Sequence, residues 1–408
     1  MSPTEAGPTP VPPASQALSG LRVLDIGHQI AGPCCARLLA DHGADVIKIE
    51  RPELGDLARR MGPYVGEEAH PEKSLTFLYL NYNKRSMTLD LKRTEGRQVL
   101  LDLVRSADIL VENFEPSFLP SLGLGYADLA SVNPRLIVTS ITNFGQTGPR
   151  RDWRGNDLID YALSGCMYIS GTANREPLKH GQFQSGYVGG LAGVVPTLAA
   201  VYMRTITGEG QHADISIADA LTSTLVMTIP YYAYMGETPR RRDDSGAYGN
   251  CTPVRDGWII PHATRSRDWS DFCDVIEEPR LLDPKFATPK GKIAHAEELD
   301  RLLHEALMKL DRFPLFHKAN KKRLLFGVVE TPEDLANCEQ MDARNFYHEI
   351  DHPVAGRLRY PGQTFETTAN GFAIRRRPPL LGEHTDEILG DLGYPQTKID
   401  SLRQAGAL

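Results

Sequence analysis

Two short segments near the start of the chain carry residue types that bind phosphates. The first is the turn Gly27–Pro33 (G-H-Q-I-A-G-P), with Glu50 following at about the distance of a ribose-binding acid. The turn lacks the G-x-G-x-x-G spacing, so a nicotinamide cofactor is disfavoured and Glu50 is interpreted as the solvated end of a strand. The second segment, Asn83–Arg85, precedes a predicted strand and is the better phosphate candidate, because paired cations bind phosphate through charge and hydrogen bonds.

Motifs for covalent and metal catalysis are missing from the sequence. The cluster Ser164–Cys166 lacks the G-x-S-x-G spacing of a nucleophile elbow, and Cys166 is interpreted as a residue that packs a helix. Neither H-E-x-x-H nor C-x-x-C occurs and the 12 histidines are scattered, so no metal site is predicted. The six cysteines form no disulfide framework, which favours a reducing, cytoplasmic location.

The composition is typical of a globular protein with a sizeable core. The 408 residues are 41% hydrophobic and 24% charged, and the length predicts roughly two or three domains. The net charge of −7 argues against a nucleic-acid partner, which would require a basic excess. The longest apolar stretch, Gly189–Met203, contains Pro196 and is shorter than the roughly 20 residues of a membrane span, so no membrane partner is expected.

The candidate residues of the N-terminal part are positioned by predicted strands and helices that alternate along the chain. Apolar runs at Leu21–Gly27 and Asp45–Glu50 flank a predicted helix over Ala31–His42, and such a βαβ unit requires parallel strands. Further strands are predicted at 86–91, 108–112, 136–141 and 212–217, with a helix over 94–106. The first 145 residues are therefore predicted to form a doubly wound α/β domain.

Shifts in composition predict how the rest of the chain is divided. We expect a disordered Pro-rich tail over residues 1–19 and a small domain over 231–329. The large domain is expected to consist of two segments, 20–230 and 330–408. The best helix of the small domain is predicted over Ala296–Leu310. The segment after residue 330 has too little core of its own, so we expect it to pack on the large domain, with a last helix near Glu383–Leu392.

Eight phrases, taken in their order and spacing, resemble the family III CoA-transferases. This group contains formyl-CoA transferase, the carnitine CoA-transferase and α-methylacyl-CoA racemase. The resemblance runs from about residue 18 to 395 and rests on LSGLRVLDIG, AGPCCARLLADHGADVIKIERPELGD, NKRSMTLDLK, ILVENFEP, LGLGY, NPRLIVTSITNFGQTGP, TGEGQHADISIADAL and PPLLGEHTDEILGDLGY. It implies a Rossmann-like large domain completed by the C-terminal segment, a smaller α/β domain, and two protomers interlocked like chain links.

The resemblance also implies CoA or acyl-CoA as a substrate, with no metal. The family positions that hold the nucleotide and pantetheine correspond to Arg51, Leu89, Asp90, Lys92, Asn113 and Phe114. The cations of this set can pair with phosphates and Phe114 can offer an aromatic face to adenine. Core packing is the alternative interpretation for Leu89 and Phe114, and a solvated charge is the alternative for Arg51 and Lys92.

The family's transfer chemistry resembles a covalent relay that begins on an Asp carboxylate. The carboxylate attacks the donor thioester, the freed CoA thiolate attacks the resulting anhydride, and the acceptor acid completes the exchange. This Asp stands at a fixed distance before T-G-x-G-Q, and the corresponding residue here is Gly186. Glycine has no side chain that can attack a thioester, so no catalytic residue is predicted at the family position.

Further departures from the family cluster around the same site. The turn that carries a His in the racemases reads Gly155-Asn156-Asp157, so racemisation is not expected. The family's active-site Gln falls on Ile30, and an Arg that contacts CoA falls near Ser121. Glu115 adds a negative charge close by, where it would disfavour an anion. Together these departures predict a chain that kept the scaffold and lost its own chemistry.

Three functions remain open on these residues. The first is the non-nucleophilic subunit of a heteromeric CoA-transferase, paired with a homologous subunit that carries the Asp, as in succinyl-CoA:benzylsuccinate CoA-transferase; the acceptor would be a carboxylic acid, with an aromatic dicarboxylate as the candidate. The second is a homomeric transferase that uses another carboxylate, Asp157 or Asp160. The third is a non-enzymatic acyl-CoA-binding protein.

Overall fold

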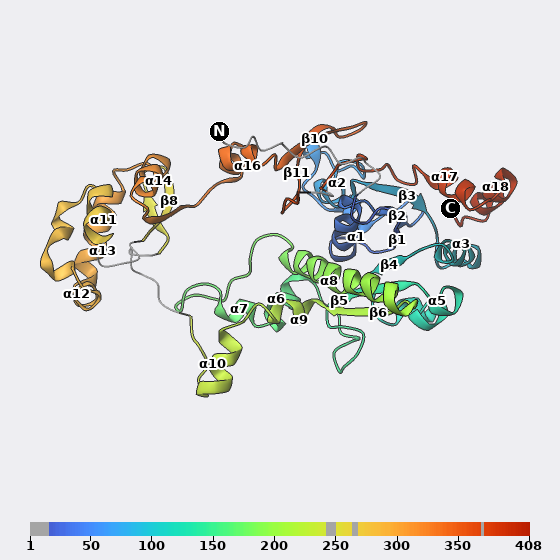
Figure 1. The fold of residues 1–408 in the computed structure, drawn as a ribbon, viewed down its shortest axis with the longest axis horizontal. Coiled ribbons are helices and arrows are strands. Elements are labelled where there is room, and N and C mark those ends of the chain that lie inside the picture. Colours follow the sequence, from blue (N-terminus) through green and yellow to red (C-terminus); the bar gives the residue numbers. More distant parts are fainter. Residues whose placement is uncertain (1–15, 242–249, 263–267, 369–370) are drawn as a thin grey trace, which may run out of the picture. The chain divides into compact units, whose positions relative to one another are not determined.

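The computed structural model describes residues 16–241, 250–262, 268–368 and 371–408 (Figure 1). They form two compact units, the larger within 16–171, 177–240 and 345–408, the smaller within 172–176 and 241–344. Residues 1–15 of the expected tail lie outside the described residues. The first described residues form a turn, in which the backbone N–H of Leu18 donates a hydrogen bond to the carbonyl of His42 at 2.9 Å.

A six-stranded parallel sheet forms the centre of the larger unit, in the order β3-β2-β1-β4-β5-β6 (Figure 1). Its strands are β1 (Arg22–Asp25), β2 (Asp45–Glu50), β3 (Lys84–Thr88), β4 (Ile109–Glu112), β5 (Ile137–Thr142) and β6 (His212–Ser216). This is the strand order of a Rossmann-like doubly wound sheet, and it confirms the predicted α/β fold class. The order reverses between β1 and β4, where such folds bind ligands at the carboxyl ends of the strands.

Both faces of this sheet are buried. Leu24 and Leu110 face one core, whereas their neighbours Val23 and Ile109 face the other. The first core is covered by α3 (Thr94–Val104), α5 (Tyr126–Val132), α17 (Thr385–Asp391) and α18 (Gln396–Gln404), and the second by α1 (Ala31–Asp41), α6 (Asp157–Leu163), α8 (Gln184–Thr207) and α9 (Ile217–Thr222). Because both faces are covered, a central strand such as β4 (ILVE) is a continuous apolar run, whereas the edge strands β3 (KRSMT) and β6 (HADIS) are more polar.

Helix α8 packs closely on α1 and β5, beside which it lies in Figure 1. A Cβ atom at Gly190 would come within 2.7 Å of the Cβ of Cys34, and one at Gly193 within 2.8 Å of Cδ1 of Ile141. Within the described residues, α8 is also the one helix long and apolar enough to cross a membrane, and 28% of its apolar window is buried. The close contact fixes the first turn of α8, which carries Gly186, beside the start of α1.

The C-terminal segment belongs to the core under the sheet. Ile388 and Leu389 of α17 and Ile399 and Leu402 of α18 are buried with the strand residues. The expectation that the helix near residue 390 is the last one was wrong, because α18 follows it. Pro395 is the N-cap of that helix with φ of −69°, so this proline begins a helix rather than marking irregular chain.

Shorter elements complete the larger unit. They are η2 (Leu57–Arg60), η3 (Val65–Glu67), α2 (Leu75–Asn81), α4 (Phe118–Ser121), α7 (Cys166–Ile169), α10 (Thr228–Met235) and an antiparallel hairpin of β10 (Tyr347–His352) and β11 (Gly356–Pro361). The hairpin packs against α2, since Ile350 and Tyr360 share a buried cluster with Leu78 and Tyr82.

The smaller unit has its own sheet and core. Its antiparallel strands are β7 (Thr252–Val254), β8 (Gly257–His262) and β9 (Leu325–Val328). Its helices are α11 (Trp269–Val275), η5 (Pro279–Leu282), η6 (Pro284–Phe286), α12 (Pro289–Ala294), α13 (Ala296–Leu307), α14 (Arg312–Lys321), α15 (Pro332–Ala336) and α16 (Glu339–Ala343). Trp269, Phe272 and Phe286 are the large side chains of this core.

Candidate functional site

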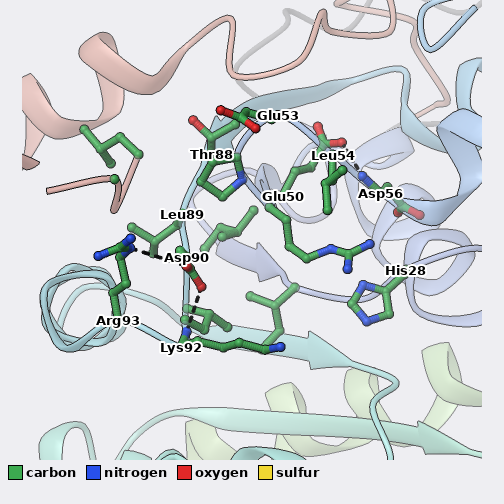
Figure 2. A pocket seen from close by; sticks show the side chains of 18 of the residues that line it. His28, Glu50, Glu53, Leu54, Asp56, Thr88, Leu89, Asp90, Lys92 and Arg93 are labelled. Atoms are coloured by element: carbon green, nitrogen blue, oxygen red, sulfur yellow. Dashed lines mark hydrogen bonds and ion pairs between the residues drawn. The ribbon is translucent and has the colours of Figure 1, made fainter. Parts of the chain in front are cut away.

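A cavity of about 570 Å³ lies at the carboxyl ends of β1, β2 and β3 in the larger unit. It is lined by the turn after β1, the loops after β2, β3 and β4, and three residues near the C-terminus, Arg403, Gly406 and Leu408. Figure 2 shows His28 at one side of this cavity, with Asp90, Lys92 and Arg93 around the loop after β3. The position is the one that the strand order predicts for a ligand.

Five of the six residues expected to hold CoA line this one cavity: Arg51, Leu89, Asp90, Lys92 and Phe114. Arg51 and Lys92 are exposed, and neither makes an ion pair to another residue of the described chain. Leu89 is 1% exposed and packs in the core, so it contributes its backbone to the cavity. Asp90 shapes the loop, because its Oδ1 accepts a hydrogen bond from the N–H of Lys92 at 2.9 Å (Figure 2).

Asn113, the sixth residue, clamps the first turn instead of lining this cavity. Its Oδ1 accepts from the N–H of His28 at 2.7 Å, and its Nδ2 donates to the carbonyl of His28 at 2.9 Å. The His28 ring packs edge-on against Phe114, with centroids 4.3 Å apart. Burial lowers the pKa of His28 to about 4, so at neutral pH this ring faces the cavity as an uncharged imidazole.

Two cations of this cavity carried no signal in the sequence. Arg93 lies beside Asp90, with its Nε 3.7 Å from Oδ2 of the carboxylate. Arg403 comes from α18, far along the chain, and pairs with Asp386. Only the packing of α18 under the sheet brings Arg403 to the loop after β3, and no local pattern could have assigned it.

Beneath the cavity lies a network of buried charges that overturns two predictions. Glu50 is 3% exposed and pairs with Arg59 at 2.7 Å, so it is not the solvated end of a strand. Lys84 is fully buried, with its Nζ 2.8 Å from Oδ2 of Asp25, and burial lowers its pKa to about 8. Asn83–Arg85 is therefore structural and is not free to bind phosphate, because its charged side chains already have partners.

The same network holds the turn that precedes α1. Asp56 accepts a hydrogen bond from the N–H of Gln29 at 2.8 Å and pairs with Lys48 at 2.7 Å. Burial opposes ionisation of Asp56, but the Lys48 ammonium and these hydrogen bonds lower its pKa. Gln29 has a positive φ of 59°, a conformation that the fixed hydrogen bond helps to maintain, and this directs Ile30 toward α8.

A second cavity, of about 560 Å³, surrounds the position of the missing nucleophile. Gly186 and Ile30 both line it, together with Asp157 and Asp160. A Cβ atom at Gly186 would lie 3.0 Å from Cβ and from Cγ2 of Ile30. A side chain at position 186 would therefore meet an apolar residue that is 5% exposed, and Ile30 would have to shift by a few tenths of an ångström.

The two alternative carboxylates in this cavity have different surroundings. Asp157 accepts a hydrogen bond from the N–H of Ser185 at 2.8 Å and forms an ion pair with Lys179 at 2.5 Å. Asp160 is 2% exposed, and its Oδ1 has no hydrogen-bond partner in the described part of the chain. Burial, aided by the charge of Asp157, raises the pKa of Asp160 to about 7. Asp157 is therefore committed to the structure, whereas Asp160 has no structural partner.

Two other expectations concern residues near these cavities. Ser121, at the position of a CoA-contacting Arg, lies on α4 and donates its hydroxyl to the carbonyl of Phe118 at 2.6 Å. Glu115 lies 3.9 Å from the guanidinium of Arg154, and both side chains are exposed. Among the described residues there is no group of three or more His, Cys, Asp or Glu side chains that could hold a metal ion.

A parallel sheet in this order, with a cavity at its switch point, is typical of nucleotide-binding α/β proteins. Residues 18–385 match CoA-transferase family III, and the chain belongs to this family. It is 32% identical to a formyl-CoA:oxalate CoA-transferase of Afipia carboxidovorans, over 97% of this chain and 98% of the relative. A similarly named protein of Rhodopseudomonas palustris is 33% identical, over 97% of each chain.

Solved structures show the same fold. The crystal structure of a CAIB/BAIF family protein from Brucella suis superposes with a TM-score of 0.84 at 31% identity, covering 92% of this chain and 99% of that one. The family membership makes CoA the substrate class of the chain. The family's α/β architecture is shared over nearly the whole length of the chain.

Proposed function

We propose that this chain is the non-nucleophilic subunit of a heteromeric CoA-transferase. The complex moves CoA from an acyl-CoA donor to a carboxylic acid, and a homologous subunit supplies the reacting Asp. The observation that carries the proposal is the contact between Ile30 and Gly186, which fills the nucleophile position with apolar atoms. The cation-lined cavity with Arg51 and Lys92 supports retained binding of CoA.

The reaction assigns different work to the two subunits. The partner's Asp carboxylate attacks the acyl carbonyl of the donor, the C–S bond breaks, and CoA thiolate leaves. The thiolate then attacks the carbonyl of the resulting anhydride on the Asp side, releasing the donor acid and forming an aspartyl-CoA thioester. The acceptor carboxylate reverses these steps with its own acyl group. This chain contributes binding and shape, and accepts no acyl group.

An exposed apolar surface supports assembly with a second subunit. Side chains on α8 and α10 stand out from the larger unit with more than half of their area exposed, including Leu191, Val195, Tyr202, Ile206, Tyr232 and Tyr234. Surfaces of this kind mark interfaces with other proteins. The interlocked arrangement expected from the family resemblance would cover them, and we propose a heteromeric form of it.

The test is expression of the chain alone, of a paralogue that carries the Asp alone, and of both together. The first substrate pairs to assay are formyl-CoA with oxalate, after the names of the relatives, and succinyl-CoA with benzylsuccinate. We expect transfer in the co-expressed complex and none from this chain alone. Turnover by the purified single chain, with an acyl adduct trapped on one of its own side chains, would overturn the proposal.

Asp160 supports a second candidate, a homomeric transferase. It is the carboxylate of the second cavity that has no structural partner, whereas Asp157 is held by Lys179 and Ser185. Activity of the chain alone that is lost in Asp160→Asn and kept in Asp219→Asn would select this candidate. Tight CoA binding with no transfer in any preparation would select the third function, an acyl-CoA-binding protein.

A further inference from the structure

We propose that a third cavity, beside Phe114, is an anion subsite that binds a carboxylate remote from the thioester. The inference rests on the proposed function, because it needs acyl-CoA in the first cavity. It adds the substrate class: acids and acyl groups that carry a second carboxylate. Thr142 and Arg151 form the site.

The third cavity has a volume of about 300 Å³ and lies at the carboxyl ends of β4 and β5. It shares Phe114 with the CoA cavity. It shares Asn113, Asn143 and Gly155 with the cavity that contains Gly186. A group attached to a thioester between these cavities therefore has an adjoining space within a few bonds of the reacting carbonyl.

Two buried polar atoms of residues that line this cavity make no hydrogen bond within the described residues. Thr142 is 5% exposed, and its hydroxyl Oγ1 makes no hydrogen bond within the described residues. The same holds, in the described ranges, for Nε of Arg151. Buried hydroxyl groups are normally satisfied, so the unsatisfied hydroxyl of Thr142 beside Arg151, whose side chain is 40% exposed, indicates a ligand that accepts hydrogen bonds.

The charge of the wall matches a single carboxylate. Arg151 and Arg154 face the cavity with one acid, Glu115, which leaves one net positive charge. Glu115 is 3.9 Å from Arg154, so the negative charge near this site is opposed by an arginine of its own. Asp152 lies 3.3 Å from Nε of Arg151, but its side chain is 67% exposed, and an exposed pair of this kind is weak.

Arginine side chains and hydroxyl groups bind carboxylates by donating hydrogen bonds to them. The phosphates of CoA have their own cations in the first cavity, Arg51 and Lys92. A carboxylate that is separated from the thioester by a short chain is therefore the ligand that fits.

The test compares two thioesters on the purified chain by calorimetry, succinyl-CoA and butyryl-CoA, which differ in the second carboxylate. We expect succinyl-CoA to bind about tenfold more tightly, the effect of a charged hydrogen bond. Arg151→Gln should reduce the preference to less than about threefold while leaving the affinity for butyryl-CoA unchanged, and Thr142→Val should reduce it in part.

Arg150→Gln is the matched control, since Arg150 belongs to the same loop, is exposed and does not line the cavity. It should keep the preference. Equal affinity for the two thioesters, including no binding of either, would overturn the subsite, as would equal losses in Arg150→Gln and Arg151→Gln. Turnover by the chain alone would instead overturn the proposed function and leave this binding comparison unaffected.

Discussion

Ile30 occupies the space that a side chain at position 186 would need. An ideal Cβ at Gly186 lies 3.0 Å from two carbons of Ile30, which is closer than nearly all Cβ contacts in proteins. Ile30 cannot turn away freely, because the N–H of Gln29 is hydrogen-bonded to Asp56 and the backbone there has a positive φ. The two positions therefore form a matched pair, a small residue opposite a branched one, and a side chain at position 186 would require Ile30 to shift by a few tenths of an ångström.

Restoring the Asp alone should destabilise the protein. Gly186→Asp places a carboxylate against Ile30, and overpacking of this kind costs about 1–3 kcal/mol of unfolding free energy. The double variant with Ile30→Ala should recover at least half of the loss, because the clashing carbons are removed. Urea unfolding monitored by circular dichroism measures both variants.

Gly181 provides the control for this comparison, since a Cβ there would meet nothing within 4 Å. Gly181→Asp should change the unfolding free energy by less than about 0.5 kcal/mol. A Gly186→Asp protein as stable as the parent, and active in transfer, would show that Ile30 does not hinder a carboxylate at this position.

Asp160 should make the stability depend on pH. Burial raises its pKa to about 7, whereas an unfolded chain titrates Asp near about 4, so the folded state holds the proton more tightly. The folded state is then favoured most at low pH, and this advantage is lost as the pH rises from about 4 through 7. Asp160→Asn should remove this part of the decline, up to about 3 kcal/mol between pH 5 and 8.

Urea midpoints measured at pH 5, 7 and 8 test the titration of Asp160. Glu112, whose pKa burial also raises to about 7, should account for a remaining decline in the variant. Glu209→Gln serves as the control, because Glu209 is exposed and should leave the profile unchanged. Identical profiles for the parent and Asp160→Asn would mean that the carboxyl is ionised in a polar environment.

Several central strands could be predicted because they are short, mainly apolar runs, such as β4 (ILVE). The predicted strand at 45–50 agrees with β2 (Asp45–Glu50), and the helix predicted from residue 94 agrees with the start of α3. The start of β3 was missed by two residues, because Lys84 and Arg85 look like solvated charges and are instead buried. No local pattern reveals that such charges have partners far along the chain.

The residues of the candidate site likewise divide into those that a sequence motif reveals and those that only tertiary packing brings to the site. Residues of a contiguous motif, such as Asp90 and Lys92, line one cavity together, and their role in binding CoA stays a prediction. Arg403 and the free carboxyl of Asp160 could not be found, since their environment depends on tertiary packing rather than on spacing. Tertiary contacts likewise explain Glu50, which pairs with Arg59 instead of facing solvent.

Lys84 and Arg85 should respond differently to substitution. Lys84→Met leaves the buried Asp25 with only the more distant Lys48, at 3.6 Å, and should cost about 3–5 kcal/mol of unfolding free energy. Arg85→Met removes pairs with carboxylates that are half exposed and should cost about 1 kcal/mol or less. Arg85→Met should also leave the affinity for CoA unchanged; a tenfold loss at unchanged stability would restore this segment as a phosphate site.

Arg51 and Lys92 should control the affinity of the chain for CoA. Both line the first cavity, and neither has an ion-pair partner among the described residues, so their charges are available to phosphates. Arg51→Ala and Lys92→Ala should each weaken CoA binding about tenfold in calorimetry, the value of a charge-assisted hydrogen bond. The loss of affinity should shrink at high salt, because exposed charges are screened.

Lys398→Ala is the control, since it removes a cation that contacts Tyr394 outside the cavity, and this variant should bind CoA like the parent. Unchanged affinity in both cavity variants would mean that the chain has abandoned its nucleotide site, and CoA in the complex would then be held by the partner alone.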